Sequence, residues 1–372
     1  MGFKCGIVGL PNVGKSTIFN AVTSAGAESA NYPFCTIDPN VGRVDVPDPR
    51  LDTISSIIKT QRVVPTSMEF VDIAGLVKGA SQGEGLGNQF LGHIRSTDAI
   101  AHVVRCFEDG DIVHVDGSVS PNRDIDTIDT ELVYADVSTV ETALERNRKL
   151  NKSINKKYTA IVAMLEGLAS HLQGIKPART FNIEDFVGEV PEVKDTWRDL
   201  HLITAKPILY VCNVEESLCA GNIDNDFTLA VKARAKAEKA QVVIISGKIE
   251  EELRQLDLAS RKEMLDSLGV EEPGLNRLIR AGYETLKLQT YFTAGEKEVH
   301  AWTINRGDKA PQAAGKIHSD FERGFICAEV YAIPDLAKAG SKAKLKEQGL
   351  IRTEGREYVV QDGDVMEFRF NV

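Results

Sequence analysis

The chain has 372 residues, of which 42% are hydrophobic and 26% charged, and this balance indicates a soluble globular protein of two or three domains. Its formal net charge of −10 argues against non-specific binding to nucleic acid, and no DNA partner is expected. No apolar run is long enough to cross a bilayer, and the first residues lead into a predicted strand instead of a secretory signal, so we expect a cytoplasmic protein without a membrane partner. The six cysteines are scattered without a C-x-x-C pair, which disfavours zinc and disulfides, and Cys35, in a predicted loop, is a candidate for redox regulation.

A glycine-rich turn at residues 9–16, G-L-P-N-V-G-K-S, lies between a predicted buried strand at 4–8 and a predicted helix at 17–24. It fits the phosphate-binding pattern G-x-x-x-x-G-K-[ST] in the context that the pattern requires. Backbone N–H groups in such a loop converge on an anion, and the helix N-terminus adds its positive end. Lys15 is expected to reach the β- and γ-phosphates and to take part in catalysis, and the Ser16 hydroxyl to ligate Mg²⁺. The residues expected to bind the nucleotide here are Asn12, Val13, Gly14, Lys15, Ser16 and Thr17.

A second motif lies downstream, where Asp72 ends a predicted strand and opens the sequence D-x-x-G. A carboxylate there can hold Mg²⁺ through water, and the Gly75 N–H can sense the γ-phosphate. Thr36 lies in a predicted loop, where a threonine can close onto Mg²⁺. The three motifs in this order are typical of switch GTPase domains and argue against a glycine turn that fits by chance. The elements predicted here are a loop at 31–40, a strand at 42–46, a helix at 50–60, a strand at 68–73, a glycine-rich segment at 78–87, a helix at 88–95 and a strand at 99–107.

A long helical stretch from 129 to 173 interrupts this alternation of strands and helices. Its apolar residues recur near heptad spacing, which predicts a helical hairpin or a short coiled coil inserted into the α/β domain. These residues are Leu132, Val140, Leu144, Leu150, Ile154, Ile161, Leu165 and Leu168. The same stretch carries a basic block formed by Arg146, Arg148, Lys149, Lys152, Lys156 and Lys157. The block is either a binding patch or a solvated helix face.

The alternation then resumes, and together the elements predict an α/β fold with a doubly wound, mostly parallel sheet. The resumed elements are a strand at 207–213, a helix at 229–239, a strand at 241–246 and a closing helix at 250–268. A compact α+β module follows, with strands at 286–293, 299–304, 325–331 and 365–370 and short helices at 317–321 and 342–348. The predicted domains are the nucleotide-binding domain in two parts, 1–128 and 201–284, the helical insertion 129–200 and the C-terminal module 285–372.

The motif expected to read the base departs from the guanine-reading pattern N-K-x-D. Asn213 can bond N7, which both purines share, but Val214 replaces the lysine that packs over the base. Glu216 replaces the aspartate that accepts the N1–H and N2 donors of guanine, and its extra methylene displaces the carboxylate. We therefore expect ATP to be preferred and GTP to bind more weakly. The loop that backs the base is expected at Ser246, Gly247 and Lys248.

The hydrolytic position is also unusual, because Leu76 follows D-x-x-G where Ras-like proteins have a glutamine that orients the attacking water. Catalysis must then be slow or come from another residue. His93, His102 and His114 are candidates. His102 lies in the middle of a strand, where a histidine is usually part of the core, so His114, in a loop after a predicted core strand, is preferred.

These motifs resemble those of the YchF/Obg-like ATPase family, which is related to the translation-factor GTPases. The resemblance rests on residues 9–17, the N-x-x-E motif at Asn213 and the C-terminal module, and it covers nearly the whole chain. It implies an ATP-preferring P-loop domain, a coiled-coil insertion and a ubiquitin-like TGS domain. It also implies Mg²⁺-dependent hydrolysis of ATP and association with ribosomes or their subunits, in a regulatory role in translation or stress. The family's hydrophobic residue in place of the glutamine corresponds to Leu76, and a histidine implicated in hydrolysis corresponds to His114.

The leading hypothesis is a slow ATPase that acts as a conformational switch. A second is a nucleotide-gated module that binds RNA or the ribosome, in which turnover is incidental. A third is a true GTPase with a degenerate base motif. Competition between ATP and GTP separates the first from the third, and ribosome association of a hydrolysis-dead variant tests the second.

Overall fold

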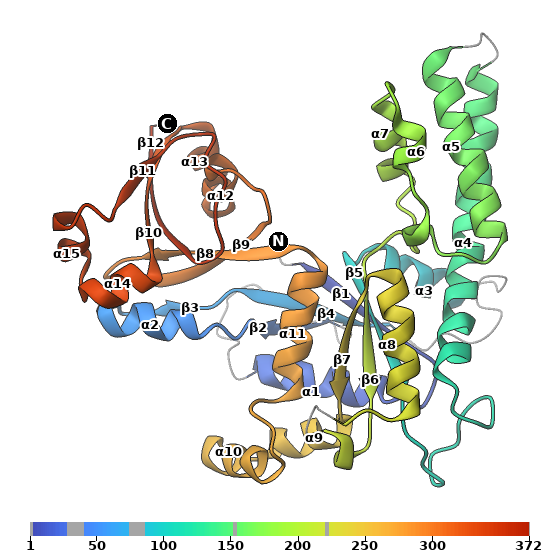
Figure 1. The fold of residues 1–372 in the computed structure, drawn as a ribbon, viewed down its shortest axis with the longest axis horizontal. Coiled ribbons are helices and arrows are strands. Elements are labelled where there is room, and N and C mark those ends of the chain that lie inside the picture. Colours follow the sequence, from blue (N-terminus) through green and yellow to red (C-terminus); the bar gives the residue numbers. More distant parts are fainter. Residues whose placement is uncertain (1–2, 28–40, 74–85, 152–154, 220–222, 372) are drawn as a thin grey trace. The chain divides into compact units, whose positions relative to one another are not determined.

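The computed structural model, drawn in Figure 1, describes residues 3–27, 41–73, 86–151, 155–219 and 223–371. It divides into two compact units, which we name the first unit (residues 1–43 and 69–281) and the second unit (residues 44–68 and 282–372). Among the described residues, no helix combines the length and apolar character that crossing a membrane requires.

The first unit contains a six-stranded sheet with the strand order β2-β4-β1-β5-β6-β7. Its strands are β1 (Lys4–Val8), β2 (Val41–Asp45), β4 (Ser67–Asp72), β5 (Ala99–Arg105), β6 (Ile208–Asn213) and β7 (Gln241–Ile245). β1 pairs in parallel with β4 and β5, and β6 pairs in parallel with β5 and β7. Every residue of β5 and β6 is buried, as expected for central strands of a parallel sheet covered on both faces. The predicted α/β fold is confirmed.

Helices alternate with these strands and follow the last one. They are α1 (Lys15–Ala27), α3 (Leu86–Arg95), α8 (Asp226–Glu238), α9 (Gly247–Gln255), α10 (Leu258–Ser267) and α11 (Gly274–Thr285). The single closing helix predicted at 250–268 is wrong. The chain ends α9 at Gln255 and restarts at Asp257, whose side chain accepts a hydrogen bond from the Ser260 N–H at 2.9 Å and caps α10.

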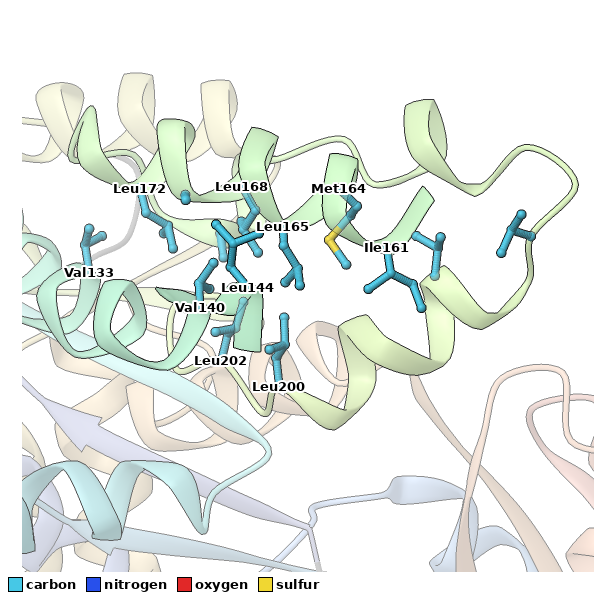
Figure 2. Close-up of a cluster of buried hydrophobic side chains, with 14 residues drawn as sticks. Val133, Val140, Leu144, Ile161, Met164, Leu165, Leu168, Leu172, Leu200 and Leu202 are labelled. Atoms are coloured by element: carbon cyan, nitrogen blue, oxygen red, sulfur yellow. The ribbon is translucent and has the colours of Figure 1, made fainter. Parts of the chain in front are cut away.

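The helical stretch forms a hairpin, as predicted, and we name residues 121–199 the arm (Figure 1). Its elements are α4 (Pro121–Leu150), α5 (Lys156–Gln173), η2 (Ala178–Thr180), α6 (Glu184–Val187) and α7 (Glu192–Asp199). Figure 2 shows the apolar side chains that join α4 to α5, with Leu144 and Leu165 in the cluster centre and Leu200 and Leu202 closing it from the returning chain. Six of the eight predicted core residues are buried; Leu150 is 47% exposed, and Ile154 lies outside the described residues.

Buried charges fix α4 to helix α8 and to the chain that returns from α7. Asp129 of α4 accepts hydrogen bonds from Arg179 and from Arg234 of α8, each at 2.9 Å to Oδ2. Both arginines also bond Glu238. Two turns further along α4, the carboxylate of Asp136 is fully buried. It accepts hydrogen bonds from the backbone N–H groups of residues 203 and 204, in the chain that returns from α7. A charged group is stable in a protein core only when it is paired, so these contacts fix the position of α4 within the first unit.

The second unit is built on a six-stranded sheet with the order β11-β10-β12-β8-β9-β3. Its strands are β3 (Val63–Val64), β8 (Leu288–Ala294), β9 (Val299–Asn305), β10 (Phe325–Ala332), β11 (Arg352–Glu354) and β12 (Asp364–Phe370). Its helices are α2 (Pro49–Ile57), α12 (Ala310–Ile317), α13 (Ser319–Arg323), α14 (Ile333–Ala339) and α15 (Lys342–Glu347). Successive strand residues enter different cores, for example Tyr291 and Phe292, because side chains alternate between the faces of a sheet. The predicted α+β module is confirmed.

Residues 44–68 belong to the second unit by contact, whereas the sequence analysis placed them within residues 1–128 of the nucleotide-binding domain. Leu51 and Ile54 of α2 lie in one apolar cluster with Phe292 and Tyr331. β3 adds a parallel strand beside β9. Pairing between segments more than 200 residues apart leaves no local periodicity, so a reading of neighbouring residues could not find it.

Candidate active site

The turn between β1 and α1 has the backbone of a phosphate-binding loop. Asn12 has φ 60°, and Gly9 and Gly14 have φ 156° and 95°. A Cβ on Gly9 would lie 2.5 Å from the Val103 carbonyl oxygen, and one on Gly14 would lie 2.2 Å from Nδ2 of Asn213. Both positions therefore exclude any larger residue, which explains the glycines of the motif.

Lys15 begins α1 and is 8% exposed, with its Nζ donating to the Leu10 carbonyl at 2.7 Å. Burial lowers the pKa of Lys15 to about 8, although the Asp72 carboxylate opposes the change. Burial likewise raises the pKa of Asp72, and Lys15 opposes that change. Asp72 ends β4 directly beside β1, opposite Ile7. The loop thus holds a partly desolvated cation that a polyphosphate would complement.

Asn213 ties the expected base site to the phosphate loop. Its side chain is 6% exposed, donates from Nδ2 to the Val13 carbonyl at 2.9 Å and accepts at Oδ1 from the Gly247 N–H at 3.0 Å. These three residues come from the ends of β1, β6 and β7, which are near one another because parallel strands end at the same edge of the sheet. Among the residues that the structure describes, the second N–H of the amide has no hydrogen-bond partner, so it can serve a ligand.

The other residues of the base motif separate into buried and exposed groups. Val214 is 2% exposed and its N–H bonds the Ile245 carbonyl at 2.9 Å, while Ser246 is 1% exposed. The carboxylate of Glu216 and the ammonium of Lys248 form an ion pair, with 47% and 70% of their side chains exposed. The carboxylate expected to read the base is therefore paired with a cation from the neighbouring loop.

His114 lies in the loop after β5 and points inward, with 7% of its surface exposed. The Asp116 N–H donates to its Nδ1 at 3.1 Å. Because an amide N–H can only donate, Nδ1 carries the lone pair and Nε2 the proton, which is donated to Oδ2 of Asp124 at 2.9 Å. Asp124 is 2% exposed in the first turn of α4, and burial raises its pKa, opposed by His114 and Arg123.

Hydrogen bonds from Asn12 and Arg105 hold this loop beside the phosphate loop and the end of β5. Asn12 donates from Nδ2 to the Val113 carbonyl at 3.2 Å. The buried guanidinium of Arg105, at the end of β5, donates to the carbonyls of Phe107, Asp109 and Ile112 at 2.9–3.2 Å. The histidine loop is consequently fixed at both its start and its middle.

The remaining histidine candidates are elsewhere. His102 is 1% exposed in β5, and burial lowers its pKa to about 3, helped by Arg179 and Arg234. It is a neutral core residue, as its position in a strand suggests. His93 lies on the exposed side of α3. Thr36, Gly75 and Leu76, and also Cys35, fall outside the described residues.

Two residues of this site, Asp124 and Arg105, are not predicted from the sequence. Asp124 follows His114 by ten residues and belongs to no motif, and its only local signal is its place in the first turn after the helix-starting Ser120 and Pro121. Arg105 ends a strand that is apolar apart from His102. A buried arginine at the end of a core strand needs hydrogen-bond acceptors around it. Its presence in the sequence therefore indicates that the following loop folds back over the side chain.

Comparison with known proteins places this site in a family. Residues 4–140 match the family model described as "50S ribosome-binding GTPase", and residues 288–371 match the model YchF-GTPase_C, described as a protein of unknown function. The chain is 52% identical to the ribosome-binding ATPase YchF of Bacillus subtilis and 53% identical to that of Escherichia coli O157:H7, each over 100% of both chains. It also resembles the solved structure of the Schizosaccharomyces pombe YchF GTPase, with a TM-score of 0.86 and 37% identity over 99% of this chain and 98% of that one. With its phosphate loop, its helical arm and its C-terminal unit, this chain belongs to the YchF family.

Proposed function

We propose that this chain is a Mg²⁺-dependent ATPase that hydrolyses ATP slowly to ADP and phosphate and acts as a ribosome-associated switch in translation or the stress response. The observation that carries the nucleotide part is the partly desolvated Lys15 in a P-loop beside Asp72. The ribosomal part is supported by the names of the relatives, which describe ribosome-binding ATPases over the same full length.

Three oxygen donors suit the metal ion. The hydroxyls of Ser16 and Thr36 and the carboxylate of Asp72 are hard ligands of the kind that Mg²⁺ prefers. Ser16 follows Lys15 at the start of α1, and Asp72 ends the adjacent strand. When bound, the ion neutralises charge on the β- and γ-phosphates. Lys15 adds a fixed positive charge at the same phosphates and in this way lowers the barrier to transfer.

The water-orienting role falls to His114, because the side chain of Leu76 cannot hydrogen-bond a water molecule. The contact between Asn12 and the Val113 carbonyl keeps the histidine loop beside the phosphate loop. Hydrolysis is expected to be slow, since the structure holds His114 away from solvent.

We expect ATP to be preferred over GTP because the extra methylene of Glu216 displaces its carboxylate from the reach that guanine needs. Glu216 also forms an exposed ion pair with Lys248, and the buried Val214 cannot supply the cation that would pack on the base. Asn213 retains one N–H for N7, which adenine and guanine share. Losing a bidentate contact in a partly buried site costs about 1–3 kcal/mol, or roughly ten- to hundredfold in affinity.

The alternative of an RNA- or ribosome-binding module would place function on the basic block of the arm. Several of its cations are paired: Arg148 with Glu166 at 2.6 Å, Lys157 with Glu192 at 3.8 Å, and Lys156 with Glu189. Lys152 lies outside the described residues. Exposed ion pairs of this kind contribute little to stability, so these cations can exchange their carboxylate partners for RNA phosphates. The basic block is therefore a second candidate site for RNA.

The test is a competition titration of ATP against GTP on the purified protein, with Glu216→Asp as the variant that restores the guanine-reading carboxylate. We expect wild type to bind ATP at least tenfold more tightly and the variant to narrow this ratio. Lys232→Ala, which removes an exposed lysine paired with Asp224, is the matched control and should leave the ratio unchanged. If wild type binds GTP as tightly as ATP, the protein is a GTPase with a degenerate motif.

A further inference from the structure

The imidazole of His114 has both nitrogens engaged in this structure. Nδ1 accepts from the Asp116 N–H and Nε2–H donates to Asp124. The side chain of His114 is 4% exposed and that of Asp124 is 3% exposed. A ring in this state has no lone pair for a water molecule, so His114 can act on the nucleotide only after leaving this arrangement.

The loop around His114 has an inverted pattern of burial. Three apolar neighbours are exposed, Ile112 by 40%, Val113 by 75% and Val115 by 49%, while the polar histidine is inside. Leaving apolar side chains in water forfeits hydrophobic stabilisation that an ordinary loop would gain. The inward histidine must therefore be held by strong specific contacts, and the buried carboxylate of Asp124 supplies a charge-assisted one.

We propose that Asp124 is a positioning residue for the hydrolytic reaction: it stores His114 as the Nε2–H tautomer in a withdrawn position, and hydrolysis follows its release. The inference rests on the proposed role of His114. Asp124 is suited to this role because it belongs to the first turn of α4, where its N–H bonds the Ser120 carbonyl at 2.9 Å. Its other oxygen lies 3.4 Å from Nη2 of Arg123, so the carboxylate is held in place while His114 leaves.

The direct test compares single-turnover hydrolysis of ATP by wild type and by Asp124→Asn. The variant keeps the shape of the side chain and an acceptor oxygen but loses the charge, so the hydrogen bond to His114 weakens. Since charge-assisted bonds are roughly twice as strong as neutral ones, we expect the hydrolysis rate to rise about three- to tenfold at unchanged affinity for ATP. Asp126→Asn is the matched control, because it removes a carboxylate of the same helix that pairs with Arg234, and its rate should stay at the wild-type value.

His114→Ala and the double variant with Asp124→Asn test the role of the histidine and the role of Asp124 separately. If His114→Ala hydrolyses ATP at the wild-type rate, the proposed role of the histidine is wrong, and the positioning role falls with it. If His114→Ala is slow but Asp124→Asn is equally slow or unchanged, the histidine acts and the storage role of Asp124 is refuted. The inference is supported when the gain of Asp124→Asn disappears in the double variant.

A spectroscopic measurement on wild type adds a readout other than the rate of hydrolysis. The ¹⁵N shifts of the imidazole, assigned by the signal missing in His114→Gln, report which nitrogen carries the proton. We expect the Nε2–H tautomer in the nucleotide-free protein and a changed pattern when a non-hydrolysable ATP analogue and Mg²⁺ are added. An Nδ1–H tautomer in the free protein, or a pattern that the analogue leaves unchanged, would overturn the proposal.

Discussion

Removing the side chain of Asn213 should loosen the first unit and abolish base recognition together. Asn213→Ala leaves two buried backbone groups without their partner, the Val13 carbonyl and the Gly247 N–H. An unsatisfied buried group costs about 1–3 kcal/mol. For the two groups together we expect about 2–4 kcal/mol of lost unfolding free energy. For a unit of this size, that corresponds to a fall in Tm of roughly 4–16 °C.

The stability assay is thermal unfolding of the nucleotide-free protein followed by circular dichroism. Asn182→Ala is the matched control, because this exposed asparagine makes one hydrogen bond, from Nδ2 to Asp185 at 2.7 Å. It should change the unfolding free energy by less than about 0.5 kcal/mol. If Asn213→Ala unfolds at the same temperature as Asn182→Ala, the two buried bonds do not stabilise the fold as argued.

The binding assay separates the base from the phosphates by using inorganic tripolyphosphate beside ATP. Wild type should bind ATP more tightly than tripolyphosphate, because Asn213 has one N–H left for the purine N7. In Asn213→Ala the affinity for ATP should fall toward that for tripolyphosphate. An unchanged ratio between the two affinities would refute a role for Asn213 at the base, whatever its effect on stability.

Three further predictions concern charged groups. Lys15→Ala should abolish ATP binding in a protein that still folds; in wild type, the affinity should fall as the pH rises above about 8, where the free Lys15 loses its proton. The pKa of Lys15 in the fold is lower than its ordinary value of 10.5, so burial of the charged side chain destabilises the fold most strongly below pH 8. As the pH rises from 8 to 10.5 this destabilisation disappears, and the unfolding free energy of the nucleotide-free protein should increase. Ser16→Ala and Asp72→Ala should weaken the dependence of ATP binding on Mg²⁺. If ATP binding by both variants depends on Mg²⁺ as it does in wild type, Ser16 and Asp72 are not ligands of the metal ion. Neutralising four cations of the basic block together should lower RNA or ribosome binding and flatten its salt dependence, whereas an unchanged salt slope would make the block a solvated face. These four are Arg148, Lys149, Lys152 and Lys156.

Local patterns predicted the first unit well, because each of its parts has a signal in neighbouring residues. The apolar run at 99–107 became β5, and the glycines of residues 9–16 are required by the close approach of Val103 and Asn213. Heptad spacing predicted the hairpin of the arm, but its start was placed at 129, eight residues late, since Ser120 and Pro121 were not recognised as a helix start. Boundaries depend on single capping residues and are harder to predict than periodic segments.

Contacts between distant segments could not be predicted. The pairing of β3 with β9 and the packing of α2 on the second unit join residues far apart in the chain. The same holds at the site, where the ion pair of Glu216 with Lys248 and the bond of His114 with Asp124 depend on how loops fold over the sheet edge. Residue types predict which groups can bind or react with a nucleotide, whereas the structure shows which of these groups are hydrogen-bonded or ion-paired within the protein.

The helix α4 of the arm begins at the site and continues without a break into the hairpin. It carries Asp124 in its first turn, Asp129 in the buried cluster with Arg179, and Asp136 where the chain returns to the sheet. Its 30 residues span about 45 Å from the histidine loop to the tip of the hairpin. The pairs of Asp129 and Asp136 hold α4 in the first unit, so a partner that tilts α4 has to work against them. Such a tilt would also move Asp124 relative to the β5 loop, and a displacement of 1 Å there is enough to break a hydrogen bond of 2.9 Å. If His114 takes part in hydrolysis as proposed, we expect a partner that tilts α4 to change the rate of hydrolysis through the position of His114, without touching the nucleotide.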